Sequence, residues 1–101
     1  MILRAPRPKA NYTVVSNAVI EDSSLSFKAR GVLIYILSKP DDWKVLVKDL
    51  MSVGNCGRDS VQAALREIEA AGYLTRTTTR DAAGRWVHIQ QIHDVPQKKE
   101  I

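Results

Sequence analysis

A segment bracketed by two glycines, Gly57 and Gly72, most constrains what this chain can fold into. Between them, apolar side chains at helical spacing share one face of a 3.6-residue period: Val61, Ala64, Leu65, Ile68 and Ala71. Gly57 suits an N-cap, and Asp59 puts a negative charge in the first turn, where the helix dipole favours it. Gly72 suits the left-handed position that ends many helices. The pattern predicts a helix over 58–71 that buries one face.

A second amphipathic segment lies upstream. Ser26 is a good N-cap, and Pro40 cannot continue a helix. The apolar side chains between them again share one face: Ala29, Val32, Leu33, Ile36 and Leu37. Ile34 and Tyr35 lie off this stripe, where they either cover an N-terminal strand or form a small dimer surface. The segment is therefore predicted to be a helix that starts after Ser26.

A shorter helix is predicted from about Leu46 to Val53. It ends at Gly54–Asn55, because both residues tolerate a left-handed backbone. The side chains expected to face inward are Leu46, Leu50 and either Val47 or Val53. Before this helix, Asp41–Asp42 should form a turn, and 43–45 is either a short strand or the lead-in to the helix. We expect Trp43 to pack in the core, as large aromatic side chains usually do.

Three segments have β-forming composition. Residues 12–15 are expected to form a short edge strand, followed by turns over 16–24. Residues 73–79 and 85–92 should pair as a hairpin around the turn Asp81–Gly84. The chain is thus predicted to be an α+β protein with three helices, a C-terminal hairpin and a short N-terminal strand. It divides into a basic flexible arm (1–11), one folded domain (12–93) and a polar tail (94–101).

The positive charge of the chain is unevenly placed. The net charge is +4, from 15 Lys and Arg against 11 Asp and Glu. Residues 1–10 contribute three bases and no acid, and 73–93 contribute three arginines against one aspartate, whereas 11–72 is close to neutral. Basic arms and loops on a neutral body are typical of polyanion binding, and solvated tails are the alternative.

Several other classes of function are not favoured by the sequence. The longest apolar run, Val32–Leu37, has six residues, far below the ~20 of a membrane span, and no signal peptide is recognisable. The single cysteine, Cys56, is expected to be a small buried apolar side chain in a cytoplasmic protein. His88 and His93 lack metal-ligand spacing, and no catalytic triad or phosphate loop is present. We therefore expect no enzyme activity, no metal and no cofactor.

A short helix, a tight turn and a longer helix followed by a basic hairpin are the parts of a helix-turn-helix with an adjoining wing. The side chains expected to read bases are Asn55, Arg58, Asp59, Ser60 and Gln62. Those expected to contact the DNA backbone are Lys28, Arg30, Lys48, Arg66, Arg76, Thr77, Thr78, Thr79, Arg80 and Arg85. The arm would add Arg4, Arg7 and Lys9. Trp86, on the second strand, either packs on the long helix or stays exposed.

Five stretches carry a family resemblance: 25–33, 38–43, 57–61, 65–74 and 80–85. They are similar to the first helix, the loop after it, the recognition helix and the wing of winged helix-turn-helix domains in phage and plasmid replication proteins and related small regulators. The resemblance covers residues 12–93 and implies a winged-helix fold that binds DNA. Such replication proteins usually have a further C-terminal domain, so 101 residues favour a stand-alone regulator, a DNA-binding accessory protein or a piece of a longer protein over a complete replication protein.

The sequence leaves two functional hypotheses open. The first is a protein that reads double-stranded DNA, with the long helix in the major groove and the hairpin on flanking backbone or minor groove. The second is a protein-binding winged-helix module, such as a small phage inhibitor of a host defence complex, because a fold does not fix a function. A homodimer is open under either hypothesis, and a membrane partner is not expected.

Overall fold

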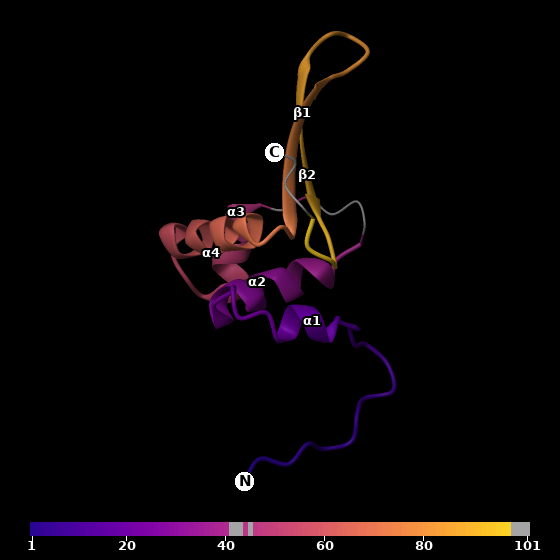
Figure 1. Ribbon diagram of the computed structural model, residues 1–101, viewed down its shortest axis with the longest axis vertical. Helices are drawn as coiled ribbons and strands as arrows, with labels where there is room; N and C mark the ends of the chain where they lie inside the picture. The colour runs from indigo at the N-terminus through magenta and orange to yellow at the C-terminus, as the bar shows by residue number, and fades with distance from the viewer. Residues whose placement is uncertain (41–43, 45, 98–101) are drawn as a thin grey trace.

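The computed structural model describes residues 1–40, 44 and 46–97. Within these residues the protein is α+β, with four helices followed by a two-stranded antiparallel sheet (Figure 1). The elements are α1 (Asn17–Ile20), α2 (Phe27–Leu37), α3 (Val47–Gly54), α4 (Arg58–Ala70), β1 (Leu74–Arg80) and β2 (Trp86–Ile92). In Figure 1 the hairpin stands away from the helices, and the N-terminal arm leaves them at the opposite end of the long axis.

Helix α2 begins as predicted, because the Oγ of Ser26 accepts a hydrogen bond from the backbone N–H of Ala29. The same serine also binds α4. Its backbone N–H donates to Oε1 of Glu67 over 2.9 Å, and its hydroxyl donates to Oε2 over 3.0 Å. One residue therefore caps α2 and fixes the start of this helix against α4.

Helix α3 ends where the sequence predicts, at Asn55, whose φ of 51° is left-handed. Leu50 is buried, and Val47 is half-buried against the core. Of the alternatives Val47 and Val53, Val47 is the one that faces inward, whereas Val53 is 57% exposed. The expectation that Leu46 faces inward is wrong, because it is 48% exposed. Leu46 is the N-cap residue, and its backbone is extended rather than helical. A short amphipathic helix buries only the side chains on one narrow face, and the others stay exposed.

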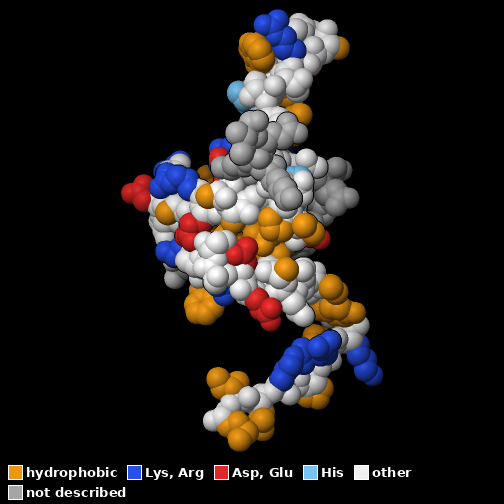
Figure 2. All heavy atoms as spheres, in the orientation of Figure 1, with side chains coloured by type: hydrophobic (Ala, Val, Ile, Leu, Met, Phe, Trp, Pro, Cys, Tyr) orange, Lys and Arg blue, Asp and Glu red, His pale blue; other side chains and the backbone are white. Residues whose placement is uncertain are grey.

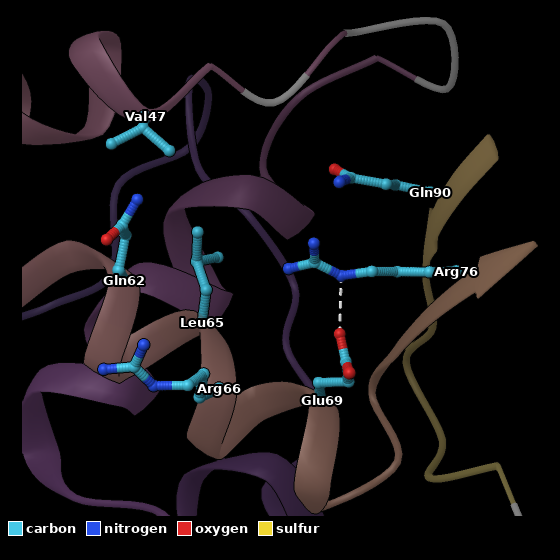
Figure 3. A pocket seen from close by; sticks show the side chains of 7 residues that line it. All are labelled: Val47, Gln62, Leu65, Arg66, Glu69, Arg76 and Gln90. Carbon is cyan, nitrogen blue, oxygen red and sulfur yellow. Dashed lines mark ion pairs between the residues drawn. The ribbon is translucent and has the colours of Figure 1, made fainter. Parts of the chain in front are cut away.

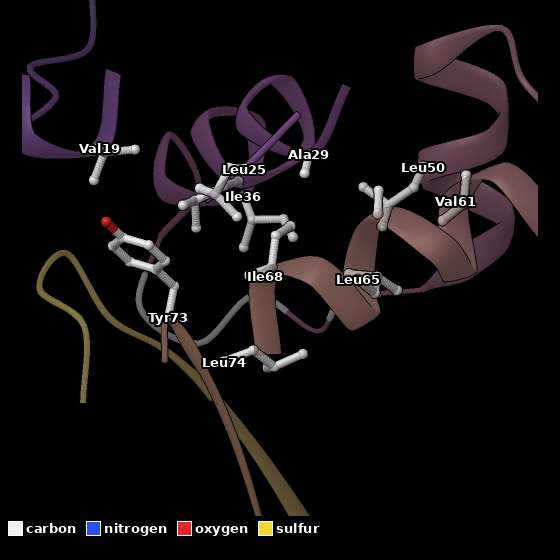
Figure 4. Packing of buried hydrophobic residues seen from close by; sticks show 12 residues of the cluster. Val19, Leu25, Ala29, Ile36, Leu50, Val61, Leu65, Ile68, Tyr73 and Leu74 are labelled. Carbon is white, nitrogen blue, oxygen red and sulfur yellow. The ribbon is translucent and has the colours of Figure 1, made fainter. Parts of the chain in front are cut away.

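The core joins one face of α4 to the inner faces of α1, α2 and α3 (Figure 4). Its buried members are Val19, Leu25, Ala29, Leu33, Ile36, Leu50, Val61, Ala64, Leu65, Ile68, Tyr73 and Leu74. Helix α4 ends at Ala70 with Ala71 as its C-cap, and Gly72 just beyond has the predicted left-handed backbone, with a φ of 94°. The chain then turns directly into β1, so the buried face of α4 holds the base of the hairpin.

The N-terminal segment differs from the prediction. Residues 12–15 form no strand, and the sheet consists of β1 and β2. Tyr12 and Val14 are exposed. A strand needs a neighbouring strand to pair its backbone groups, and β1 pairs only with β2 in the described sheet. The expected turns of 16–24 include the short helix α1, in which the Oγ of Ser16 accepts from the N–H of Ala18 and Val19 is fully buried.

The hairpin has the predicted strands and a regular register, from Leu74 opposite Ile92 to Arg80 opposite Trp86. At its turn, one carboxylate oxygen of Asp81 accepts from the N–H groups of Ala83 and Arg85, both at 2.9 Å. Only the base of the hairpin reaches the core, because β1 is exposed from Arg76 onward. The hairpin at one end and the arm at the other give the molecule its extents of 57 × 30 × 28 Å.

Some predicted features lie outside the described residues. These are the expectations for Asp41, Asp42 and Trp43, and for the end of the tail over 98–101. Cys56 is half-buried against the core, close to its expected place. Within the described part of the chain, no helix has the length and apolar composition needed to cross a membrane.

Candidate nucleic-acid interface

A groove of about 430 Å³ lies between α4 and the base of the hairpin (Figure 3). Helix α4 lines it with Gln62, Arg66 and Glu69, which are four and three residues apart and so share a stripe on the helix surface. The hairpin lines it with Arg76 and Gln90, which are directly opposite each other on β1 and β2. The groove therefore joins the helix surface to one face of the hairpin.

An ion pair spans this groove. The Nε of Arg76 lies 2.5 Å from a carboxylate oxygen of Glu69, and both side chains are about half exposed. Figure 3 shows the two side chains directed toward each other, from β1 and α4 respectively. The guanidinium of Arg76 is thus held beside the groove with its charge compensated locally.

One face of the hairpin continues the groove toward the tip. Because side chains alternate along a strand, the cross-strand pairs Arg76–Gln90, Thr78–His88 and Arg80–Trp86 share that face. We call these six residues the basic face. Its members contact one another: Oγ1 of Thr78 is 3.3 Å from Nδ1 of His88, and Cζ of Arg80 lies 4.4 Å from the centre of the Trp86 ring.

The opposite face of the hairpin is uncharged. It carries Thr75, Thr77, Thr79, Val87, Ile89 and Gln91. The predicted backbone contacts Thr77 and Thr79 therefore lie on the other side of the hairpin from Arg76 and Arg80. Thr78 is the member of the threonine run that lies on the basic face.

The turn adds one more cation. Arg85 has a side chain that is 81% exposed, and its Nε lies 3.3 Å from a carboxylate oxygen of Asp81. Figure 2 shows Lys and Arg side chains at the tip of the hairpin and along the arm, at the two ends of the molecule. The arm residues Arg4, Arg7 and Lys9 are all exposed. The structure does not bring the arm and the hairpin together.

The predicted base-reading residues fall into two groups. Asn55, Arg58 and Asp59 are exposed around the turn between α3 and α4. Ser60 is half-buried and accepts a hydrogen bond from Nζ of Lys28, which joins the start of α4 to α2. Gln62 lies further along α4, in the groove beside Arg66. The exposed start of α4 and the residues of α4 that line the groove thus lie on one continuous side of this helix.

Two of the predicted backbone contacts lie away from this side. Arg30 is half-buried, donates to the backbone oxygen of Ile20 over 3.1 Å and lies over the ring of Phe27. It therefore links α2 to α1. Lys48 is exposed on α3, outside the groove lining.

Sequence reasoning missed three residues of the basic face: Trp86, His88 and Gln90 were not among the predicted contacts. The signal that could have found them is strand alternation, because the register of the hairpin puts each opposite a predicted residue of β1. In the described residues, no three His, Cys, Asp or Glu side chains come together in a group that could hold a metal ion.

No protein-family model, curated protein or solved structure matches this chain. The chemistry of the candidate interface is therefore the basis for a proposal of function. That surface consists of the exposed side of α4, the groove with Arg66 and Arg76, and the basic face that leads to Arg80 and Trp86.

Proposed function

We propose that the protein binds double-stranded DNA as a winged helix, with α4 in the major groove and the hairpin as the wing. The observation that carries the proposal is the continuity of basic side chains from Arg66 on α4 through Arg76 to Arg80 on the hairpin. A polyanion that follows this line would meet cations along both elements. In this role the protein would act as a small regulator or a replication accessory.

The side chains on α4 suit base reading. Arg58 and Gln62 are four residues apart on its exposed side, so they would reach successive base edges. Arginine pairs with two acceptors of guanine, and a glutamine amide pairs with adenine. The order α3, tight turn at Asn55 and α4 is that of a helix-turn-helix, in which the first turns of the second helix contact bases.

The hairpin suits the DNA backbone. Arg80 and Arg85 lie at its exposed end, and the hydroxyl of Thr78 lies on the same face as Arg80. Contacts of this kind fix the orientation of the protein on the duplex and carry no sequence information. The proposal therefore separates a specific role for α4 from a non-specific role for the hairpin.

The test is fluorescence anisotropy with a labelled random-sequence duplex and with duplexes recovered by selection. Arg58→Ala should cost about 1–3 kcal/mol on the selected sequence and relax one base position. Arg80→Ala should weaken all sequences alike and reduce the slope of log affinity against log salt by about 0.9. Lys39→Ala, which removes one charge just after α2, is the matched control and should change neither.

A different result would favour the protein-binding alternative. That reading requires capture of a protein partner that survives both nuclease and high salt, because contacts to several phosphates weaken steeply with salt. If duplex binding were absent at low salt, or independent of salt, the proposed function would be wrong.

A further inference from the structure

We propose that the tip of the hairpin is a stacking site for an unpaired nucleobase, so that the preferred DNA is a duplex with a single-stranded junction or an open end. This inference rests on the proposed function and names the class of DNA that the same surface takes. The side chains that carry it are Trp86 and Arg80.

Trp86 is exposed to solvent and lies too far from the core to pack against it. Its side chain is 63% exposed, at the end of the hairpin distant from the buried Leu74. Arg80 lies six positions after Leu74 on an extended strand, a distance of about 20 Å. An indole left in water gives up the stabilisation that burial of a large apolar side chain provides. Its placement is therefore better explained by a ligand than by folding.

The surroundings of Trp86 match a nucleobase. The guanidinium of Arg80 lies over the indole, with 4.4 Å between Cζ and the ring centre, and Trp86 is still largely exposed beside this contact. Flat, electron-rich bases stack on aromatic rings and on arginine planes. Arg85 adjoins Trp86 in the chain and offers an exposed cation for the phosphate of the stacked nucleotide.

The charge around Trp86 disfavours an apolar protein partner. Covering the indole with an apolar surface would also remove water from the guanidinium of Arg80, and burying a charge without an ionic partner is costly. Asp81 is the acid of the turn, and its carboxylate already binds two backbone N–H groups and Arg85. An anionic ligand with a flat apolar ring satisfies both the arginines and the indole.

The choice between intact and open DNA follows from the cost of reaching a base. In an intact duplex every base is stacked on its neighbours, and separating a base step costs about as much as stacking on an aromatic side chain returns. A base at a junction or an open end offers its face without that cost. Trp86 should therefore add little affinity for a sealed duplex and about tenfold for DNA with an unpaired base.

The experiment compares two labelled DNAs of the same duplex sequence. One is sealed at both ends by covalent loops bridged with a non-nucleotide linker, and the other has single-stranded tails at one end. We expect the wild-type protein to bind the tailed DNA about tenfold more tightly. Trp86→Leu keeps an apolar side chain but removes the ring, so it should abolish the preference, with a much larger loss of affinity on the tailed DNA than on the sealed duplex.

Ile89→Ala is the matched control. Ile89 is an exposed apolar residue of the same strand, but it lies on the opposite face of the hairpin. It should retain the full preference. Equal affinity of the wild type for both DNAs, or an equal loss by Trp86→Leu on both, would overturn the inference while leaving the proposed function intact. If neither DNA binds, the proposed function itself fails.

Discussion

At the scale of single residues, Glu69 lowers the net positive charge of the groove. Its carboxylate lies among basic side chains, 2.5 Å from Nε of Arg76. Because both side chains are about half exposed, the pair contributes only about 0–1 kcal/mol to stability. Its larger consequence is electrostatic, since it compensates the charge of Arg76, a cation that the proposed function places beside a phosphate.

Replacing Glu69 by Gln removes the negative charge and keeps the size of the side chain. We expect DNA affinity to rise about threefold, because Arg76 becomes available and a repulsive charge leaves the groove. Fluorescence anisotropy at low salt measures the change. Glu21→Gln, at the exposed end of α1, changes the net charge equally and is the control. A rise no larger than that of Glu21→Gln would mean that the ion pair does not restrain Arg76.

Tyr73 and Asp22 form the most strongly perturbed pair of titratable groups. The hydroxyl of Tyr73 donates to a carboxylate oxygen of Asp22 over 2.7 Å. Burial, followed by this hydrogen bond, raises the pKa of Tyr73 to about 12. Hydrogen bonds from Ser24, and then from Tyr73, lower the pKa of Asp22. The pair ties the loop after α1 to the start of the hairpin.

Tyr73→Phe should lower the free energy of unfolding by about 1 kcal/mol at neutral pH. Because the folded pKa of Tyr73 is raised above the value of 10 for an unfolded tyrosine, the wild type loses stability as pH rises from 10 through about 12. The variant lacks this loss, so the two should converge in that range. Urea unfolding at several pH values measures it. Tyr12→Phe, at an exposed tyrosine, should behave as wild type at every pH, and a constant gap between Tyr73→Phe and wild type would contradict the linkage.

At the scale of elements, two glycines have opposite roles. Gly31 lies inside α2, and a Cβ there would meet no atom within 4 Å. Gly72 has a φ of 94°, and a Cβ would lie 2.6 Å from the backbone oxygen of Gln97. The first position therefore tolerates a side chain, and the second does not.

Gly31→Ala should raise the free energy of unfolding by about 0.5–1 kcal/mol, because alanine loses less backbone entropy in a helix. Gly72→Ala should lower it by about 1–3 kcal/mol, through left-handed strain and the contact with Gln97. Thermal unfolding followed by circular dichroism compares the two variants, and each serves as the control for the other. The same sign for both would show that these glycines do not differ as the geometry requires.

The elements that sequence could predict are those with their own signals. Helix α4 was predictable because glycines bracket a regular apolar stripe, and the hairpin because two β-prone runs flank Asp81–Gly84. Helix α1 has four residues and no period to detect. It depends on the cap from Ser16 and on the contact of Arg30 with Ile20, which only the folded chain supplies. Residues 12–15 have strand composition but no sheet edge beside them.

At the scale of the whole molecule, the excess of positive charge lies at two ends. The arm and the hairpin leave the helical body at opposite ends of the 57 Å axis (Figures 1 and 2). The segments that carry this charge can be read from the residue order, but their separation cannot, because position in the chain does not determine direction in space. The residue order also could not show that Arg30 is used within the fold, or that Trp86 lies opposite Arg80.

Replacing Arg4, Arg7 and Lys9 together by Ala should leave the unfolding midpoint unchanged, because all three are exposed. DNA affinity should fall for every sequence, and the salt slope should decrease by up to about 2.7 if each cation meets a phosphate. Anisotropy over a salt series measures the slope. An unchanged slope would mean that the arm does not take part in binding.

The way the hairpin is anchored has a consequence for how this protein can diversify. Since only the base of the hairpin is buried in the described structure, insertions and exchanges beyond Arg76 should change the length and surface of the hairpin without disturbing the helices. Lengthening both strands by two residues keeps each side chain on its side, whereas one residue would invert the pattern. The distal hairpin is thus an interchangeable module, on which new specificities can be selected or engineered over an unaltered scaffold.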